Sequence, residues 1–471
     1  MSRAYTIPDD AWRHLYSVYG FFIALATTVL LAICVWPGLM SFDSILAYRQ
    51  SIEGVETAIW PPMHDYLFYV SRMLSGGPGG LFVVQCFVLF YSASAICGHF
   101  ARSGPMAAAM GVGLVALFFL FPTLAGTVIV LWKDVVVVSF SLAAIATWLS
   151  GVRRFQWWKF FCVFFFLIIA ISLRYNALPL VLPFMLLTVI NPAGRASDTR
   201  KRIGALAGAM LVLSVSYATT LWRLPDFKRL PPVGNLVGVI NLWDLTGVSA
   251  CENLNLLPEG LESGERIPAA DFKRIFDSRH LNITFTNPIW QAHVPRWGVD
   301  ASAIQAQWRT VIREHPLCYL KIRNAVFLEQ FGLHRHQVFY PTHSGIDGNK
   351  FGLQLAYPAR TSALVQDIVA WSNSPLRRIY LLHAVALVLA VIAVWINRWR
   401  YDLLFALGLG IIGFVGLLYF AAPAADARYV FPSGVFSALL AILALGRITM
   451  WIRAKRPVPT TEGENSSRRL S

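Results

Sequence analysis

Long runs of apolar residues, each about as long as a membrane span, recur along most of the 471-residue chain. A helix needs about 20 mostly apolar residues to cross a bilayer. The pattern predicts ten spanning helices, at 16–36, 81–101, 105–124, 131–150, 158–174, 176–190, 203–222, 378–396, 402–421 and 429–450. Two long stretches, 37–80 and 223–377, lack such runs. The sequence therefore predicts an all-α polytopic membrane protein with a mixed segment outside the membrane.

The predicted spans and the stretches between them divide the chain into consecutive parts. The segment 223–377 has the charge, turns and prolines of a small soluble domain. The expected parts are an N-terminal membrane module at 1–222 that includes the loop 37–80, an extracytoplasmic segment at 223–377, a C-terminal membrane module at 378–450 and a basic cytoplasmic tail at 451–471.

Composition agrees with a membrane protein, and the placement of charge predicts its orientation. Only 14% of the residues are charged and 56% are hydrophobic, whereas about 25% of a soluble domain is charged. The 40 Lys and Arg residues exceed the 25 acids, but they punctuate apolar runs and form no stripe suited to nucleic acid. Because basic loops stay in the cytoplasm, we expect both termini there and the stretches 37–80 and 223–377 on the outer face.

The first outer loop carries several polar residues beside an amphipathic segment. Ser41 is placed to cap a short helix whose first turn contains Asp43, and Gln50 follows in the same segment. The sequence from Trp60 to His64, Trp-Pro-Pro-Met-His, completes the loop. A carboxylate in the first turn of a helix is stabilised by the helix dipole. Asp43 is therefore either a structural capping acid or a general base at the membrane surface, and the residues alone leave both open.

Three further charged motifs stand at the outer ends of predicted spans. Lys133-Asp134 opens the fourth span, Arg174 joins the fifth to the sixth, and Arg428-Tyr429 opens the last. Acidic residues inside a membrane are costly and often functional, and an arginine can bind an anionic oxygen with two hydrogen bonds. The structural alternatives are a Lys133–Asp134 pair that anchors the helix end and an interfacial anchor at Arg174.

The predicted topology brings these motifs to one side of the membrane. Asp43, His64, Asp134, Arg174 and Arg428 are far apart in sequence, yet all are expected at the outer boundary between water and lipid. Two acids with two guanidinium groups suit an anionic substrate carried by a lipid. An ion pathway would instead need charges near the middle of the membrane, where several of the predicted spans hold almost none.

The order of these motifs resembles that of bacterial GT-C-type glycosyltransferases, multispanning relatives of the protein mannosyltransferases and of the lipid A aminoarabinose transferase. The resemblance covers 1–190 and 378–450 as an order of motifs and not as a long identity. It rests on Asp43 after the first span, the Trp60–His64 motif, Trp-Lys-Asp ending at Asp134, Arg174 at a tight turn, and Arg428-Tyr429 followed by Pro432.

This resemblance implies the inverting transfer of a sugar from a polyprenyl phosphate carrier to an acceptor on the outer face of a bacterial inner membrane. The implied partners are the lipid-linked sugar donor, membrane lipid and a glycan, lipid or protein acceptor. Asp43 would be the general base and Asp134 a second acid that orients the acceptor or a metal. Arg428, Arg174 and Lys133 would bind the donor phosphate.

The resemblance leaves the remaining contacts and the metal open. Gln50, Trp60, His64 and Tyr429 are candidates for substrate contact. Many members of the family have a second acid beside the catalytic one, whereas Ser44 follows Asp43 here. A divalent ion such as Mg²⁺ or Mn²⁺ is therefore an expectation without assigned ligands.

The segment 223–377 offers two further features. Cys251 and Cys318 are its only cysteines and either form a disulfide in an oxidising compartment or remain buried thiols. The histidines around 334–343 lack a zinc-like spacing, so a solvated or acceptor-binding loop is favoured over a metal site. We expect this segment to cap the active site and select the acceptor.

Two other function classes share an outward site for a lipid phosphate. A transporter or flippase for a lipid-linked saccharide predicts polar residues in mid-membrane, broken helices or an inverted repeat. A polysaccharide polymerase or ligase would attack with a sugar hydroxyl of a long glycan and release a diphosphate. The motif order favours the glycosyltransferase.

Overall fold

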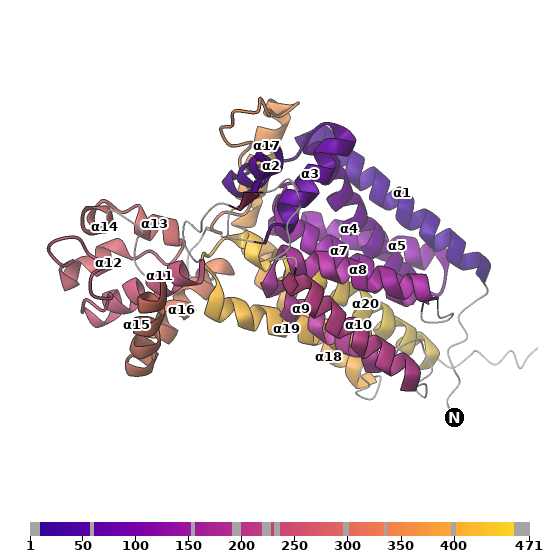
Figure 1. Ribbon diagram of the computed structural model, residues 1–471. Helices are drawn as coiled ribbons and strands as arrows, with labels where there is room; N and C mark the ends of the chain where they lie inside the picture. The colour runs from indigo at the N-terminus through magenta and orange to yellow at the C-terminus, as the bar shows by residue number, and fades with distance from the viewer. Residues whose placement is uncertain are drawn as a thin grey trace, which may run out of the picture.

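The computed structural model describes residues 10–56, 61–151, 156–190, 199–218, 228–229, 236–294, 301–333, 337–396 and 402–455. These residues are mostly helical, and they form a large bundle with a smaller helical group at one end (Figure 1). The predicted all-α architecture of the membrane modules is confirmed for these residues.

Six helices are long and apolar enough to cross a membrane. They are α1 (Asp10–Val35), α4 (Gly79–Phe100), α7 (Lys133–Gly151), α18 (Ile379–Ile396), α19 (Leu403–Ala421) and α20 (Phe431–Lys455). Each of them coincides with a span predicted from the sequence. The pattern indicates a multi-pass membrane protein.

The predicted span at 105–124 is not one straight helix. Instead, α5 (Gly104–Leu120) and α6 (Pro122–Val128) meet at an angle of 94°. Phe121 between them has extended backbone angles, φ −105° and ψ 93°. A residue before proline is disfavoured in the helical region, and proline itself has no N–H for the helix ladder. Counting this bent pair as one span gives seven candidate spans.

Three shorter apolar helices coincide with the remaining predicted spans. They are α8 (Trp157–Leu173), α9 (Leu178–Ile190) and α10 (Thr199–Ala218). Their apolar parts have 10–17 residues, fewer than the roughly 20 that a perpendicular span needs. Length and composition thus support six or seven spans among the described residues, and the ten-span count stays a prediction.

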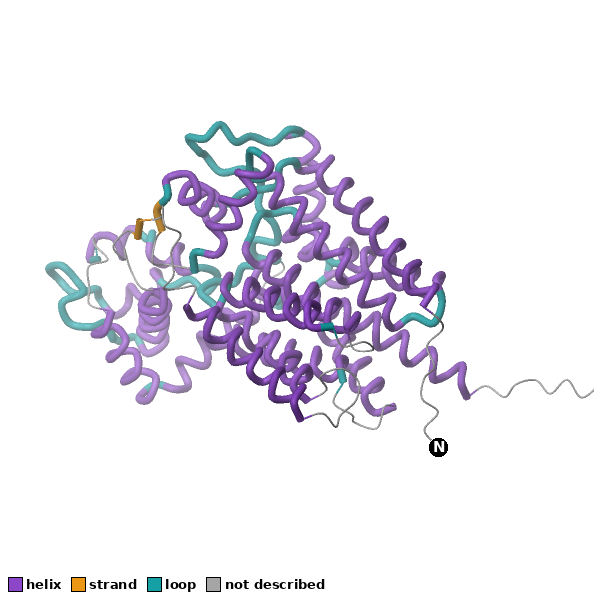
Figure 2. Tube along the Cα trace, turned by 45° about the vertical axis from the view of Figure 1, so that its right-hand side comes forward, coloured by secondary structure: helices purple, strands orange, loops and turns teal. Residues whose placement is uncertain are grey.

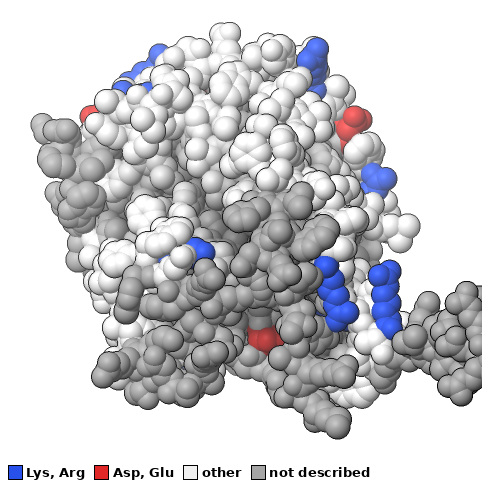
Figure 3. Space-filling view, turned by 90° about the vertical axis from the view of Figure 1, so that its right-hand side faces the viewer, with Lys and Arg blue, Asp and Glu red and all other residues white. Residues whose placement is uncertain are grey.

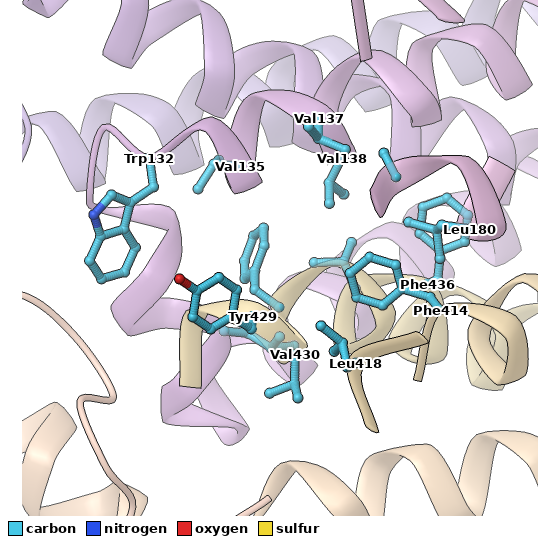
Figure 4. Packing of buried hydrophobic residues seen from close by; sticks show 14 of the residues in the cluster. Trp132, Val135, Val137, Val138, Leu180, Phe414, Leu418, Tyr429, Val430 and Phe436 are labelled. Carbon is cyan, nitrogen blue, oxygen red and sulfur yellow. The ribbon is translucent and has the colours of Figure 1, made fainter. Parts of the chain in front are cut away.

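The helix α7 lies inside the bundle, in contact with α4, α8 and α20. The side chains of Val135, Val136, Val137 and Val138 are at most 1% exposed. Figure 4 shows this part of α7 facing aromatic and aliphatic side chains of α9, α19 and α20. A helix that is apolar all round is typically buried on all sides. The N-terminus of α7 therefore lies within one end of the bundle, and Lys133 and Asp134 lie there with it.

Two short helices of the first loop cover this end of the bundle. They are α2 (Phe42–Glu53) and α3 (Met63–Ser75), and they contact each other (Figure 1). Gly54 ends α2 in the left-handed conformation, with φ 63°, which glycine adopts without steric cost. The strand β1 (Val55–Glu56) then pairs in parallel with β2 (Lys228–Arg229), with Val55 opposite Lys228.

The segment 223–377 contributes a separate helical group. This group contains α11 (Leu236–Glu252), η2 (Ala269–Asp271), α12 (Phe272–Ile275), α13 (Leu281–Phe285), α14 (Pro288–His293), α15 (Ala301–Glu314) and α16 (Pro316–Gln330). In Figure 2, loops gather between the group and the bundle. Arg323 joins the two parts, because its Nη1 donates to the carbonyl of Ala422 over 2.8 Å.

The last part of the same segment belongs to the bundle instead. The helix α17 (Pro358–Ser372) packs on α1 and α6, and η3 (Pro375–Arg377) leads into α18. The Thr361 hydroxyl donates to the carbonyl of Cys34 over 2.8 Å.

On the end of the bundle opposite the outer group, isolated Lys and Arg side chains stand on a surface that is otherwise mostly uncharged among the described residues (Figure 3).

Cys251 of α11 and Cys318 of α16 form a disulfide. Of the two alternatives left open by the sequence, the structure therefore contains the disulfide. The bond joins the two helices that form the centre of the outer group, across a sequence separation of 67 residues.

Replacing Cys251 and Cys318 together with serine should destabilise the outer group. Closing a loop of this size restricts the unfolded chain and contributes about 2–4 kcal/mol. Limited proteolysis during a thermal ramp should cleave the double variant at lower temperature within 236–330. Cys162→Ser, which removes a free cysteine, is the control. Equal protease resistance of all three proteins would contradict the expectation.

Candidate active site

A small pocket lies where the first loop, the start of α7 and the start of the last span meet. Its lining residues come from these three distant parts of the sequence and are Asp43, Ala47, Pro61, His64, Trp132, Lys133 and Arg428. Four of the residues proposed from the sequence alone as site residues are among them. The structure thus brings Asp43, His64, Lys133 and Arg428 together.

Backbone pairing fixes the start of α2 against the start of α7. The Leu39 N–H donates to the carbonyl of Ile129 over 3.0 Å, and the Leu131 N–H donates back to the carbonyl of Leu39 over 2.8 Å. The Ser44 hydroxyl adds a 2.8 Å bond to the carbonyl of Leu131. These bonds set the position of Asp43, in the first turn of α2, relative to Lys133.

The predicted helix after Ser41 is present, but the predicted side-chain cap is not. Ser41 occupies the N-cap position without a capping hydrogen bond from its side chain. Its Oγ instead accepts from the indole Nε1 of Trp132 over 2.8 Å. Ser41 therefore bonds to a residue distant in sequence and not to its own helix. This bond adds a further link between α2 and the residues that precede α7.

Arg428 is the counter-ion of Asp43. Its Nη1 lies 2.8 Å from Asp43 Oδ2, and its Nε lies 3.2 Å from Asp426 Oδ2. Arg428 belongs to η4 (Ala427–Val430), the short turn that precedes α20. Its guanidinium carbon lies 5.0 Å from the centre of the Trp132 ring and 5.1 Å from that of Tyr429. One arginine therefore holds two carboxylates and packs between two aromatic rings.

A second ion pair also lies close to Tyr429. Arg174, at the end of α8, pairs with Asp134 of α7, and their side chains are 13% and 2% exposed. The Arg174 guanidinium lies 4.9 Å from the centre of the Tyr429 ring. The ring of Tyr429 therefore lies close to both arginines, and Figure 4 shows it beside Trp132 at the edge of the packed core.

Breaking the Asp134–Arg174 pair should destabilise the protein more than replacing both members. Removing one partner leaves a buried charge without its counter-ion, which typically costs about 3–5 kcal/mol. We expect Arg174→Met and Asp134→Leu each to lower the melting temperature in detergent, and the double variant to recover much of the loss. Additive losses in the double variant would show that the two side chains do not depend on each other.

Burial and charge act in opposite directions on the ionisable groups outside the spans. Burial alone would raise the pKa of Asp43, but Arg428 and Lys133 outweigh it, so that this pKa lies below 3.8. Burial lowers the pKa of His64 to about 3. Burial raises the pKa of Asp426, against the opposing effect of Arg428. At neutral pH Asp43 is therefore a carboxylate and His64 a neutral imidazole.

The other predicted site residues have different surroundings. Tyr429 and the Asp134–Arg174 pair lie next to the pocket without lining it. Gln50 is buried in α2, at 1% exposure, and is not among the lining residues. Trp60 lies outside the described residues.

Sequence reasoning missed two residues that belong to the site. Asp426 faces Arg428 from two positions earlier, and only its closeness in sequence to Arg428 could have pointed to it. The Tyr340 ring lies 6.0 Å from that of Trp132, and its hydroxyl bonds to His343. Tyr340 also has a left-handed backbone, with φ 51°, which is uncommon outside glycine. No pattern in the sequence pointed to Tyr340.

The stretch around Tyr340 connects the segment 223–377 with the pocket. The Ala427 N–H donates to the carbonyl of Phe339 over 3.1 Å. The Met40 N–H donates to the carbonyl of Gly345 over 2.9 Å, and the Asp347 N–H donates to the carbonyl of Met40 over 2.9 Å. This stretch therefore contacts both the first loop and the turn that carries Arg428.

The described residues do not fit the divalent metal expected from the resemblance. No three His, Cys, Asp or Glu side chains among them come together in an arrangement that could hold a metal ion. Asp43 and Asp134 each pair with an arginine instead. His343 bonds to Tyr340 and Asp347, while His334 and His336 lie outside the described residues. We therefore derive no step that uses a metal.

No protein-family model, curated protein or solved structure matches the chain.

Proposed function

We propose that the protein is a membrane glycosyltransferase that moves a sugar from a polyprenyl phosphate to an acceptor hydroxyl, as the motif resemblance implies. The observation that carries this proposal is the convergence of Asp43, Lys133 and Arg428 on one pocket at the end of the helical bundle. A carboxylate base beside several cations suits a reaction in which a proton is removed and a phosphate departs.

Asp43 is the proposed general base. The acceptor oxygen attacks the anomeric carbon, its proton passes to the Asp43 carboxylate, and the bond from that carbon to the phosphate oxygen breaks. The electron pair of the broken bond leaves on the phosphate. Attack from the face opposite the leaving group inverts the anomeric configuration. The low pKa of Asp43 keeps it deprotonated before each turnover.

The cations stabilise the charge that develops on the leaving phosphate. Lys133 and Arg428 line the pocket, and Arg174 lies one aromatic ring away from Arg428. Asp134 keeps Arg174 in place and is assigned a positioning role, because its contact is with that arginine and it does not line the pocket. Charge stabilisation of this kind is often the largest contribution to catalysis.

The acceptor is proposed to enter beside the segment 223–377. Its stretch from Phe339 to Asp347 bonds to the first loop and to the turn of Arg428. An outer segment in that place can select a glycan, lipid or protein acceptor. With the first loop on the outer face, the proposed location is a bacterial inner membrane with both termini cytoplasmic and the pocket facing outward.

A transporter of lipid-linked saccharides is the second candidate. The 94° break between α5 and α6 is the observation that favours it, because broken helices are common at transporter sites. The charged pocket nevertheless includes a carboxylate placed for proton removal, which translocation alone does not require.

Mass spectrometry of envelope glycans and lipids tests the proposal in cells. Cells without the protein should lack one sugar substituent, and the wild-type chain should restore it. Asp43→Asn, expressed at the same level in the membrane, should not restore it. Identical glycan and lipid profiles in all three strains would contradict the proposed function.

A further inference from the structure

The charges around the pocket are distributed unevenly. Arg428 faces the carboxylates of Asp43 and Asp426, so that its positive charge is balanced within the protein. Arg174 is likewise balanced by Asp134. Lys133 and His64 line the same pocket. An anionic ligand in this pocket would therefore lie within reach of a lysine and an imidazole as well as of Arg428.

Three helix N-termini meet at the pocket. Asp43 is the second residue of α2, His64 is the second residue of α3, and Lys133 is the first residue of α7. Each N-terminus carries a partial positive charge and backbone N–H groups without a helical partner. Such ends commonly bind phosphate groups.

His64 supplies an independent sign that a ligand binds here. The residue is only 6% exposed, and its buried Nε2 has no hydrogen-bond partner among the described residues. Its ring packs against Phe68 with the two ring centres 4.8 Å apart. A buried polar atom without a partner destabilises a fold. Its position in the lining of the pocket makes a bound ligand the natural partner.

The pKa of His64 indicates which form of its ring faces the pocket. Burial lowers the pKa of His64 to about 3, and Lys133 lowers it further than Asp43 raises it. The imidazole is therefore neutral, and Lys133 acts on it more strongly than Asp43 does. A neutral imidazole can donate an Nε2–H hydrogen bond to an anionic oxygen in the pocket while Lys133 supplies the positive charge.

We propose that the ligand phosphate binds between His64 Nε2 and Lys133, at the N-termini of α3 and α7, and that Arg428 chiefly holds Asp43. This inference rests on the proposed function, which supplies a phosphate as the leaving group, and it assigns the place of that phosphate. His64 becomes a phosphate-binding residue and not a second base.

Binding of farnesyl monophosphate to the full chain in detergent tests this assignment without requiring turnover. His64→Phe keeps a ring of similar shape but removes the donor, whereas His64→Gln keeps an N–H near the same position. Losing a hydrogen bond to a charged oxygen should weaken binding by about 10- to 100-fold in His64→Phe. His64→Gln should retain most of the affinity. Farnesol should bind weakly to all three proteins.

Thermal unfolding without ligand separates binding from folding. His64→Phe should not melt below the wild type, because it removes a buried atom that has no partner. His383→Phe is the matched control, since His383 Nε2 lies 2.8 Å from the Ser433 hydroxyl, and it should melt earlier. Wild-type affinity for farnesyl monophosphate in His64→Phe, or no binding by the wild-type protein, would overturn the assignment.

These experiments distinguish failure of the phosphate-site assignment from failure of the proposed transferase function. If farnesyl monophosphate binds in a His64-dependent manner but no sugar is ever transferred, the phosphate site stands and the transferase proposal fails. If inorganic phosphate binds as tightly and with the same dependence on His64, the site stands and a lipid carrier is contradicted. If sugar is transferred and His64→Phe binds normally, only the assignment of the phosphate fails.

Discussion

Replacing Asp43 with asparagine should lower the rate of sugar transfer by about 10²- to 10⁴-fold, the usual contribution of a general base. The amide cannot accept the proton of the acceptor, although it keeps the size of the side chain and can still accept a hydrogen bond from Arg428. The rate should be measured with purified protein and a saturating lipid-linked sugar donor, so that the loss is assigned to the chemical step.

The chain offers a matched control for this variant. Asp271 pairs with Arg274 over 3.1 Å at the surface of the outer group, where the Arg274 side chain is 72% exposed. Asp271→Asn should leave the rate unchanged. If the rate of Asp43→Asn stays within a few-fold of the wild-type rate, Asp43 is not the general base.

The low pKa of Asp43 also fixes the direction of the pH dependence. The carboxylate is the active form, and Arg428 and Lys133 hold its pKa below the ordinary value of an aspartate. Asp43 should therefore cause no loss of rate between pH 7 and pH 5. The same pairing stabilises the fold above the unfolded-state pKa, and this contribution is lost as the pH falls through the folded-state pKa.

Replacing Arg428 with methionine should both abolish transfer and destabilise the protein. The arginine is 12% exposed, and its removal leaves the carboxylates of Asp43 and Asp426 without their shared counter-ion. Breaking a buried pair typically costs about 3–5 kcal/mol. The pKa of Asp43 should rise as well, because Arg428 is the main influence that lowers it. Any residual activity should therefore decline at a higher pH than in the wild type.

Arg428→Lys separates charge from geometry. A lysine keeps the positive charge but lacks the planar fork that reaches two carboxylates at once, so the variant should fold better than Arg428→Met and still transfer slowly. Arg274→Met removes an exposed arginine and is the control for both. A melting temperature in Arg428→Met equal to that of Arg274→Met would contradict the role of Arg428 in holding the two acids.

Six of the ten predicted spans coincide with helices long and apolar enough to cross a membrane, because a long apolar run is typical of a spanning helix. The sequence placed the break between α5 and α6 inside one span, since hydropathy alone does not register the proline at position 122. The three shorter helices illustrate the same limitation of hydropathy, because an apolar run does not show where within it a helix begins and ends. Helix ends depend on local backbone chemistry and on neighbours that a linear pattern omits.

The site was predictable only in outline. Topology correctly predicted that Asp43 and Arg428 share one end of the bundle, although 385 residues separate them. It could not predict that the Ser41 hydroxyl bonds to Trp132 instead of capping α2. It also gave no reason to notice Asp426 as a second partner of Arg428. Such pairings are decided by tertiary packing between distant segments.

The most direct test of the central claim is transfer by purified protein in proteoliposomes. The donor is a polyprenyl phosphate that carries an isotope-labelled sugar, and envelope extracts supply the acceptor. We predict that labelled acceptor and free polyprenyl phosphate appear in equal amounts, and that Asp43→Asn forms neither. Movement of the intact labelled lipid across the bilayer, without any free polyprenyl phosphate, would contradict a glycosyltransferase and identify a transporter.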